Sequence, residues 1–135
     1  MDGNRRWAKE RGLPTLEGHA RGYGNLKDII RMVNRVSIPH MVVYAFSTEN
    51  WKRAEEEVGY LMKLLHHALK ELPEIIAKEG KRINIRVIGE RHVLSKELQE
   101  VISDVESKNY IDPELTVWVA LSYGGRVEIV DAVNR

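Results

Sequence analysis

The run HMVVYAF at residues 40–46, followed at once by the polar turn STEN at residues 47–50, indicates the fold class of this chain. Its apolar side chains are nearly continuous, which is typical of a parallel strand that is covered on both faces. Parallel strands are joined by helical crossovers, so helices are expected before and after this run.

The rest of the chain alternates between helical and strand periods. Apolar residues recur at three- and four-residue steps in the helical segments, and Pro73 is expected to kink or split the second of them. The sequence therefore predicts an α/β fold with an open parallel sheet, helices on both faces and incomplete ends, in a single partial domain spanning residues 1–135. The expected helices are residues 22–36, 55–78, 98–105 and 126–133, and the expected strands are residues 40–46, 83–88 and 115–121.

Composition excludes several classes of protein. The 135 residues are 43% hydrophobic and 30% charged, which suits one globular unit, and the formal net charge is only +1. A balanced charge offers no field that would recruit nucleic acid or an anionic membrane. There is no cysteine, so disulfides and thiolate metal sites are excluded, and any metal would be held by oxygen or imidazole.

The chain carries no recognisable targeting segment. No window approaches the roughly 18 to 20 apolar residues of a membrane-spanning helix. The first seven residues, MDGNRRW, lack the apolar stretch of a secretory signal, although this means little if the natural N-terminus has been lost. We expect a soluble, cytoplasmic protein.

The first polar cluster combines DGNRRW at residues 2–7 with GHARG at residues 18–22. Backbone N–H groups near a glycine, together with arginine and histidine side chains, suit the oxygens of a diphosphate. Asp2 would repel such an anion unless Mg²⁺ lay between them. The alternative is a solvated arm with ordinary surface arginines and a helix-capping aspartate.

The second cluster, STENWKR at residues 47–53, follows the buried run directly. Hydroxyls, an amide, an indole and a guanidinium within seven residues are dense functionality for a turn. Alternatively, Ser47 or Thr48 caps the next segment, Trp51 plugs the core and Arg53 faces water.

A third cluster, YGGR at residues 123–126, is read more simply as a glycine-rich turn from strand to helix. The remaining histidines, at positions 40, 66, 67 and 92, have no zinc-like spacing and are read as structural or exposed.

Taken together, these three blocks resemble the bacterial cis-prenyltransferases in identity, order and spacing over essentially the whole chain. The resemblance implies Mg²⁺-dependent condensation of isopentenyl diphosphate with an allylic diphosphate such as farnesyl diphosphate. It further implies a homodimer whose product is a membrane-associated lipid, in the cytoplasm or peripheral to the membrane, and no nucleic-acid partner.

The resemblance also implies roles for individual residues. Asp2 would serve the metal, and Asp2 with Asn50 would be catalytic. A neutral amide is a poor base, so Asn50 is expected to orient a diphosphate or the carbon that loses its proton. The long helix with Leu61, Met62, Leu65 and Leu69 resembles the family's tunnel wall, although ordinary core packing explains most of those residues equally well. The allylic substrate would be held by Gly3, Asn4, Arg5, Arg6, Trp7 and His19, and the reacting groups would be surrounded by Ser47, Thr48, Glu49, Asn50, Trp51 and Arg53.

The sequence also departs from the family pattern. Thr15, Ser37 and Ala54 stand where arginine, glycine and proline are usual, which puts one phosphate contact and two backbone features in question. Family chains are considerably longer, with a strand before Asp2 and a later arginine-rich segment that binds isopentenyl diphosphate. We therefore expect a truncated or fragmentary chain that folds poorly, because a missing strand exposes edges and apolar surface.

Two other functions are kept open. A non-catalytic subunit that binds a full-length synthase is the first alternative, although a scaffold would have no need for Asp2, Asn50, Trp51 or Arg53. A nucleic-acid module is a more distant alternative, since the overall charge is balanced.

Overall fold

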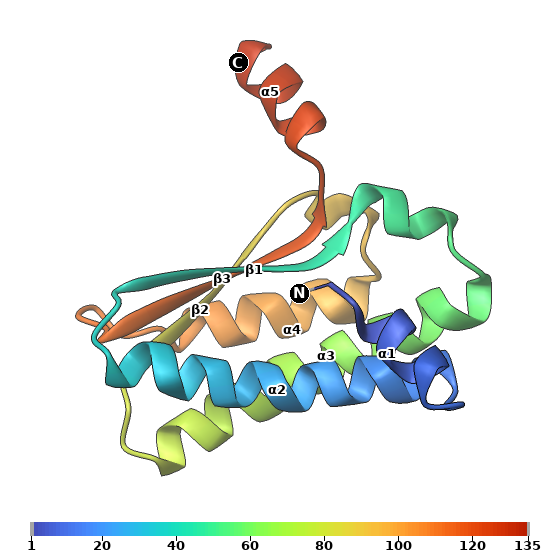
Figure 1. The fold of residues 1–135 in the computed structure, drawn as a ribbon. Coiled ribbons are helices and arrows are strands. Elements are labelled where there is room, and N and C mark those ends of the chain that lie inside the picture. Colours follow the sequence, from blue (N-terminus) through green and yellow to red (C-terminus); the bar gives the residue numbers. More distant parts are fainter. Residues whose placement is uncertain (1, 135) are drawn as a thin grey trace.

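Three parallel strands form an open sheet in the order β1-β3-β2 in the computed structural model, which describes residues 2–134 (Figure 1). The parallel α/β fold predicted from the sequence is confirmed. The strands are β1 (His40–Ser47), β2 (Ile83–Ile88) and β3 (Leu115–Tyr123), and the helices are α1 (Asn4–Glu10), α2 (Thr15–Arg35), α3 (Glu55–Lys78), α4 (Lys96–Ser107) and α5 (Gly125–Val133), with short 3-10 turns η1 (Thr48–Lys52) and η2 (Arg91–Val93).

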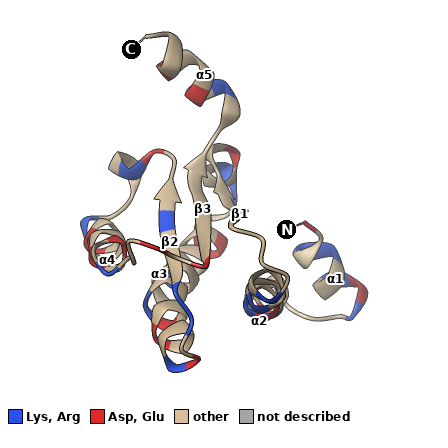
Figure 2. Ribbon diagram, turned by 90° about the vertical axis from the view of Figure 1, so that its left-hand side faces the viewer, with Lys and Arg blue, Asp and Glu red and all other residues tan. Residues whose placement is uncertain are grey.

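The core lies between the sheet and the helices α2, α3 and α4. Alternate residues of each strand point into it, as the pleat of a strand requires. Residues Val43, Val119 and Ile85 represent the three strands, and Ile30, Leu69 and Ile102 represent the three helices. The strands carry almost no charge, whereas Lys, Arg, Asp and Glu are spread over the helices (Figure 2). α3 continues through Pro73 as one helix, so the predicted split is not observed.

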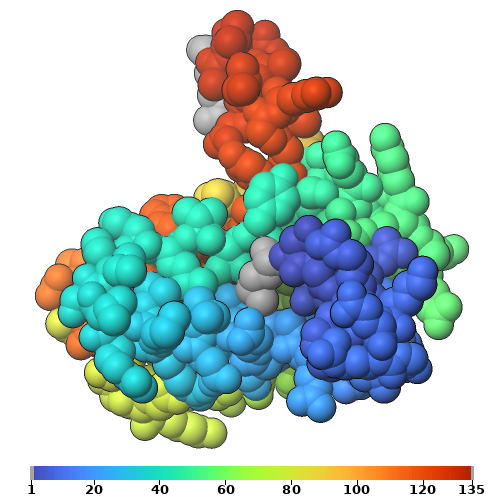
Figure 3. Space-filling model, viewed as in Figure 1, coloured from blue at the N-terminus to red at the C-terminus, as the bar shows by residue number. Residues whose placement is uncertain are grey.

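The opposite face of the sheet is not covered by helices within residues 2–134. Val42 of β1 is 65% exposed and Tyr44 is 47% exposed. The sequence predicted helices on both faces, but α5 rises clear of the main body instead of lying on the sheet (Figure 3). Its residues Ile129 and Val133 are exposed as a result.

The outer edge of β2 is closed by side chains. The Asn109 amide bonds both the N–H and the carbonyl of Ile85, at 3.0 and 2.9 Å. Glu106 accepts the N–H of Val87 at 2.9 Å, and Arg91 donates to the carbonyl of Val87. These groups give the edge strand the partners that another strand would otherwise supply.

Two departures from the family pattern have a visible backbone context. Ser37 adopts a φ of +58°, a left-handed conformation that favours glycine. Ala54 precedes α3 with a φ of −55°, which is close to the value that proline enforces. The first substitution therefore costs conformational energy, whereas the second leaves the geometry unchanged.

Candidate active site

A polar cavity of about 1070 Å³ opens between α1, the start of α2 and the end of β1. It brings together the two polar clusters that the sequence singled out, although 25 positions separate the end of the first, at Gly22, from the start of the second, at Ser47. The lining includes nine of the predicted site residues, namely Asp2, Gly3, Asn4, Arg5, Arg6, His19, Ser47, Asn50 and Arg53.

Asp2 stands at the mouth of this cavity with its carboxylate in solvent. Gly3, at a φ of +98°, turns the chain so that its N–H donates to Asp2 Oδ1 at 2.6 Å. Arg6 donates to the other carboxylate oxygen at 3.0 Å. The hydrogen bond from Gly3, followed by the charge of Arg6, lowers the pKa of Asp2. The carboxylate is thus ionised at neutral pH and exposed, as a metal ligand has to be.

Glycines on α2 allow α1 to pack closely against it. A Cβ at Gly18 would lie 2.1 Å from the carbonyl oxygen of Asn4, and one at Gly22 would lie 2.5 Å from the Asn4 amide nitrogen. Neither distance is possible between real atoms, so only glycine permits this approach. The GHARG segment therefore positions α1, and with it the N-terminal side of the cavity.

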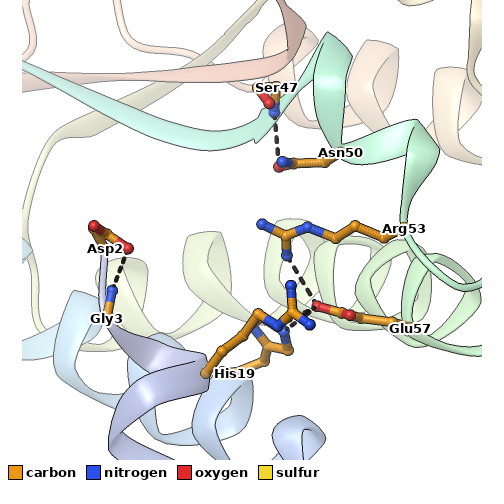
Figure 4. Close-up of polar contacts among 8 residues, drawn as sticks. Asp2, Gly3, His19, Ser47, Asn50, Arg53 and Glu57 are labelled. Atoms are coloured by element: carbon orange, nitrogen blue, oxygen red, sulfur yellow. Dashed lines mark hydrogen bonds and ion pairs between the residues drawn. The ribbon is translucent and has the colours of Figure 1, made fainter.

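Glu57 of α3 joins the two clusters from beneath the cavity (Figure 4). Its Oε1 lies 3.0 Å from His19 Nε2, 2.9 Å from the Arg53 guanidinium and 3.8 Å from Arg5 Nε. Burial opposes ionisation of this carboxyl, but the hydrogen bond from His19 and the charges of Arg5 and Arg53 outweigh it and lower the pKa of Glu57. One buried carboxylate thus holds His19 and Arg53 at hydrogen-bond distance at the cavity wall, with Arg5 close by.

Ser47 and Asn50 form a reciprocal capping box at the end of β1. The Ser47 N–H donates to Asn50 Oδ1 at 3.0 Å. This contact occupies the amide oxygen, and none of the hydrogen bonds found within residues 2–134 uses the amide nitrogen. The Asn50 side chain therefore presents a hydrogen-bond donor toward the cavity that it lines.

Four predicted site residues do not line the cavity. The Trp51 indole packs edge-on against Phe46, with ring centroids 4.9 Å apart, and donates to Ser122 Oγ at 2.9 Å. Thr48 lies against Gly124, where a Cβ would come within 2.7 Å of its hydroxyl oxygen. Trp7 stacks under the Arg11 guanidinium, and Glu49 is exposed.

Those contacts give the YGGR segment a structural part, in agreement with its reading as a turn. Gly124 of this segment, and Ser122 just before the segment, support the neighbouring turn after β1. The roles that the resemblance assigns to Trp7, Thr48, Glu49 and Trp51 remain predictions.

A second, apolar cavity of about 120 Å³ adjoins the polar one, between α2, α3 and the sheet. The two share several lining residues, including His19, Ala45 and Leu61, so the two cavities lie side by side. Leu65 and Leu69 line the apolar cavity as the tunnel interpretation predicted, whereas Met62 does not. The arrangement suits a molecule with an anionic head and a hydrocarbon tail.

Glu57 is the site residue that sequence reasoning missed. From sequence alone, the EEE run at residues 55–57 indicates only acidic residues suited to the start of a helix. Arg53 lies before α3 in an extended conformation, so no helical spacing links it to Glu57 in the sequence. Nothing in the local sequence indicated that His19 and Arg5 would meet the same carboxylate.

The residues present fit a magnesium ion held mainly by substrate. Within residues 2–134, no three His, Cys, Asp or Glu side chains gather as a metal-binding group. Mg²⁺ is often bound by one or two carboxylates together with substrate phosphates. The exposed, ionised Asp2 beside a cationic cavity matches that pattern.

None of the helices in the described part of the chain combines the length and hydrophobicity needed to span a bilayer.

Comparison with known proteins gives a consistent result. A family model described as undecaprenyl diphosphate synthase matches residues 1–135. An isoprenyl transferase of Chromobacterium violaceum is 41% identical over 135 residues, which are the whole of this chain and 53% of that protein. An isoprenyl transferase of Thermotoga maritima is 39% identical over 134 residues, 99% of this chain and 57% of that protein. The chain thus spans about half the length of the curated relatives it matches.

Solved structures show the same fold. Lavandulyl diphosphate synthase from Lavandula x intermedia, in complex with dimethylallyl diphosphate, superimposes with a TM-score of 0.94 at 32% identity, covering 99% of this chain and 57% of the other. A probable undecaprenyl diphosphate synthase from Campylobacter jejuni superimposes with a TM-score of 0.77 at 34% identity, covering 85% of this chain and 55% of the other.

Proposed function

Because this chain belongs to the undecaprenyl diphosphate synthase family, we propose that it condenses isopentenyl diphosphate with an allylic diphosphate to form a cis-prenyl diphosphate. The allylic carbon–oxygen bond breaks, and the diphosphate leaves with the electron pair. The double bond of isopentenyl diphosphate then forms the new carbon–carbon bond, and loss of a proton from the adjacent carbon leaves a cis double bond. One observation carries the proposal: a cavity lined by several cationic side chains adjoins an apolar one and shares lining residues with it.

The cationic wall of the cavity suits the departing diphosphate. Arg5, His19 and Arg53 are held by Glu57, so they keep their positions while charge develops on the leaving group. Preorganised donors of this kind need little rearrangement during the reaction and stabilise developing negative charge. Binding and departure of the allylic diphosphate are therefore assigned to this wall.

Asn50 is assigned an orienting part. Its amide oxygen is occupied by the Ser47 N–H, so the amide nitrogen is the group left to contact substrate. An N–H donor binds a phosphate oxygen and does not accept a proton. The expectation that Asn50 orients a diphosphate is therefore favoured over a role as base.

Asp2 is the residue proposed to hold Mg²⁺, together with diphosphate oxygens. When bound, the ion would neutralise phosphate charge and make the diphosphate a better leaving group. Arg6 keeps the carboxylate ionised and oriented in the meantime. Assembly as a homodimer and location in the cytoplasm, or peripheral to the membrane that receives the lipid product, belong to the same proposal.

The test is turnover of labelled isopentenyl diphosphate in Mg²⁺ with dimethylallyl diphosphate and, separately, with farnesyl diphosphate, followed by extraction of label into butanol. The chain is assayed as given and with the coding sequence that flanks it at its locus. Arg53→Ala is expected to abolish turnover, whereas Lys52→Ala, at an exposed neighbouring position, serves as the matched control. Turnover by neither form, with both folded, would overturn the proposal and favour a subunit that binds a full-length synthase.

A further inference from the structure

The apolar cavity beside the active site is bounded by a tyrosine ring from α2. Tyr23 lines this cavity together with Leu26 of the same helix and Leu69 and Leu72 of α3. Its hydroxyl donates to Glu71, which belongs to α3 and is not part of the lining. The hydrogen bond to Glu71 therefore holds the ring against α3, and its acceptor lies outside the cavity lining.

Two further contacts hold the ring. The Lys27 ammonium lies 4.8 Å from the ring centroid, and the His67 ring meets it edge-on at 6.4 Å. Lys27 and His67 also lie 3.6 Å from the same Glu71 oxygen. Burial and the hydrogen bond to Glu71 raise the pKa of Tyr23, so the hydroxyl stays protonated and continues to donate. Swinging the ring away would break its contacts with Glu71, Lys27 and His67 together.

The apolar cavity that the Tyr23 ring bounds is small. Its volume of about 120 Å³ is less than the roughly 150 Å³ of an apolar cavity that holds one benzene molecule. A hydrocarbon group of about five carbons is therefore the largest that fits without displacing the walls. A longer tail would have to displace a lining side chain, and Tyr23 is the largest aromatic residue that the helices contribute to the lining.

We propose that Tyr23, held by Glu71, is a specificity-determining residue that restricts the allylic tail accepted by this chain to about one five-carbon unit. The inference rests on the proposed function, because it assumes that an allylic diphosphate binds with its head at the cationic wall. It deepens that function by naming the tail length that the site prefers.

The experiment is calorimetric titration in Mg²⁺ with three probes: inorganic diphosphate, dimethylallyl diphosphate and farnesyl diphosphate. Unmodified protein should bind farnesyl diphosphate no more tightly than dimethylallyl diphosphate. Tyr23→Ala should improve the affinity for farnesyl relative to dimethylallyl diphosphate by about tenfold or more. Tyr23→Leu, which also removes the ring but keeps an apolar helix former, should do the same if the alanine variant is poorly folded.

Two control variants separate the ring from other effects. Tyr23→Phe keeps the ring with its Lys27 and His67 contacts but loses the bond to Glu71, so it should relax the preference less than Tyr23→Ala does. Tyr60→Ala removes a half-buried tyrosine of α3 that lines neither cavity, and it should change nothing.

An affinity ratio that stays within about twofold in both Tyr23→Ala and Tyr23→Leu, with inorganic diphosphate still bound, would overturn the inference alone. Tighter binding of farnesyl diphosphate by the unmodified protein would overturn it as well. Failure of all three probes to bind folded protein would overturn the proposed function, and this inference with it.

Discussion

Replacing Glu57 with glutamine tests the electrostatic centre of the site. Glutamine has nearly the same shape as glutamate, so the substitution removes charge without creating a cavity. The side chain of Glu57 is buried and accepts from His19 and Arg53 at about hydrogen-bond distance. The variant therefore measures how much the ionised carboxylate contributes.

The expected loss follows from these contacts. A hydrogen bond that involves a charged group contributes about 1.5–3 kcal/mol, against about 0.5–1.5 kcal/mol between neutral groups. Two such bonds at Glu57 lose about 1 kcal/mol each. Arg5, at 3.8 Å and more than half exposed, adds at most a few tenths of a kcal/mol. The free energy of unfolding at pH 7 should fall by about 2 kcal/mol.

The loss should also depend on pH. The pKa of Glu57 is lower in the folded chain than in an unfolded one. A carboxyl of this kind stabilises the folded state above its unfolded pKa of about 4.3, and that stability disappears as the pH falls through the lower, folded value. The difference between the glutamine variant and the unmodified protein should therefore shrink as the pH falls below the unfolded value of about 4.3.

Urea unfolding followed by tryptophan fluorescence, at pH 7 and again below the unfolded pKa of about 4.3, measures the free energy of unfolding of each variant. Glu56→Gln is the matched control, because Glu56 occupies the same first turn of α3 but is exposed. Equal destabilisation by the two variants would refute the reasoning. So would a loss in the Glu57 variant that persists undiminished at low pH.

Three further predictions concern packing, metal and solubility. Gly18→Ala should destabilise the fold by about 1–3 kcal/mol and weaken diphosphate binding, because the new methyl group meets the Asn4 carbonyl oxygen. Gly24→Ala, on the same helix, places its methyl group in open space and should stabilise the fold by about 0.5–1 kcal/mol. Urea titrations measure both changes. Asp2→Asn should change the free energy of unfolding by less than about 0.5 kcal/mol, because the side chain is exposed. In calorimetry the same variant should lose the enhancement of diphosphate binding by Mg²⁺, and an enhancement that survives would remove Asp2 as the ligand. Val42→Lys should reduce aggregation on heating, measured by light scattering, without lowering the free energy of unfolding, because it places a charge on the exposed face of an edge strand. Unchanged aggregation would point to another surface.

Much of the fold could be predicted because local signals agreed with one another. The apolar run of β1, the matching runs of β2 and β3, and the periodic face of α3 all lie close to their predicted bounds. α2 begins at Thr15, seven residues before the predicted start. The start of this helix contains Gly18 and Gly22, which pack against α1. Glycines add nothing to the periodic pattern of apolar residues from which a helix is predicted.

Individual residues of the site could be predicted from the sequence, but the contacts between them could not. The motif residues Asp2, His19 and Asn50 all line one cavity, as the resemblance implied. Glu57 was missed because its three partners come from α1, α2 and the turn after β1, and such convergence exists only after folding. Trp51 offered two readings from sequence, and its packing on Phe46 depends on a tertiary contact that the local pattern does not contain.

Because side chains close the outer edge of β2, a further strand can be added to this sheet only at the β1 edge. With the backbone groups of Ile85 and Val87 already bonded to Asn109, Glu106 and Arg91, a further strand has no free partners there. Recruitment is left to β1, whose last residues also line the polar cavity. A peptide or domain that extended the sheet by strand addition would therefore arrive beside the residues proposed to bind substrate, on the strand whose end lines the polar cavity.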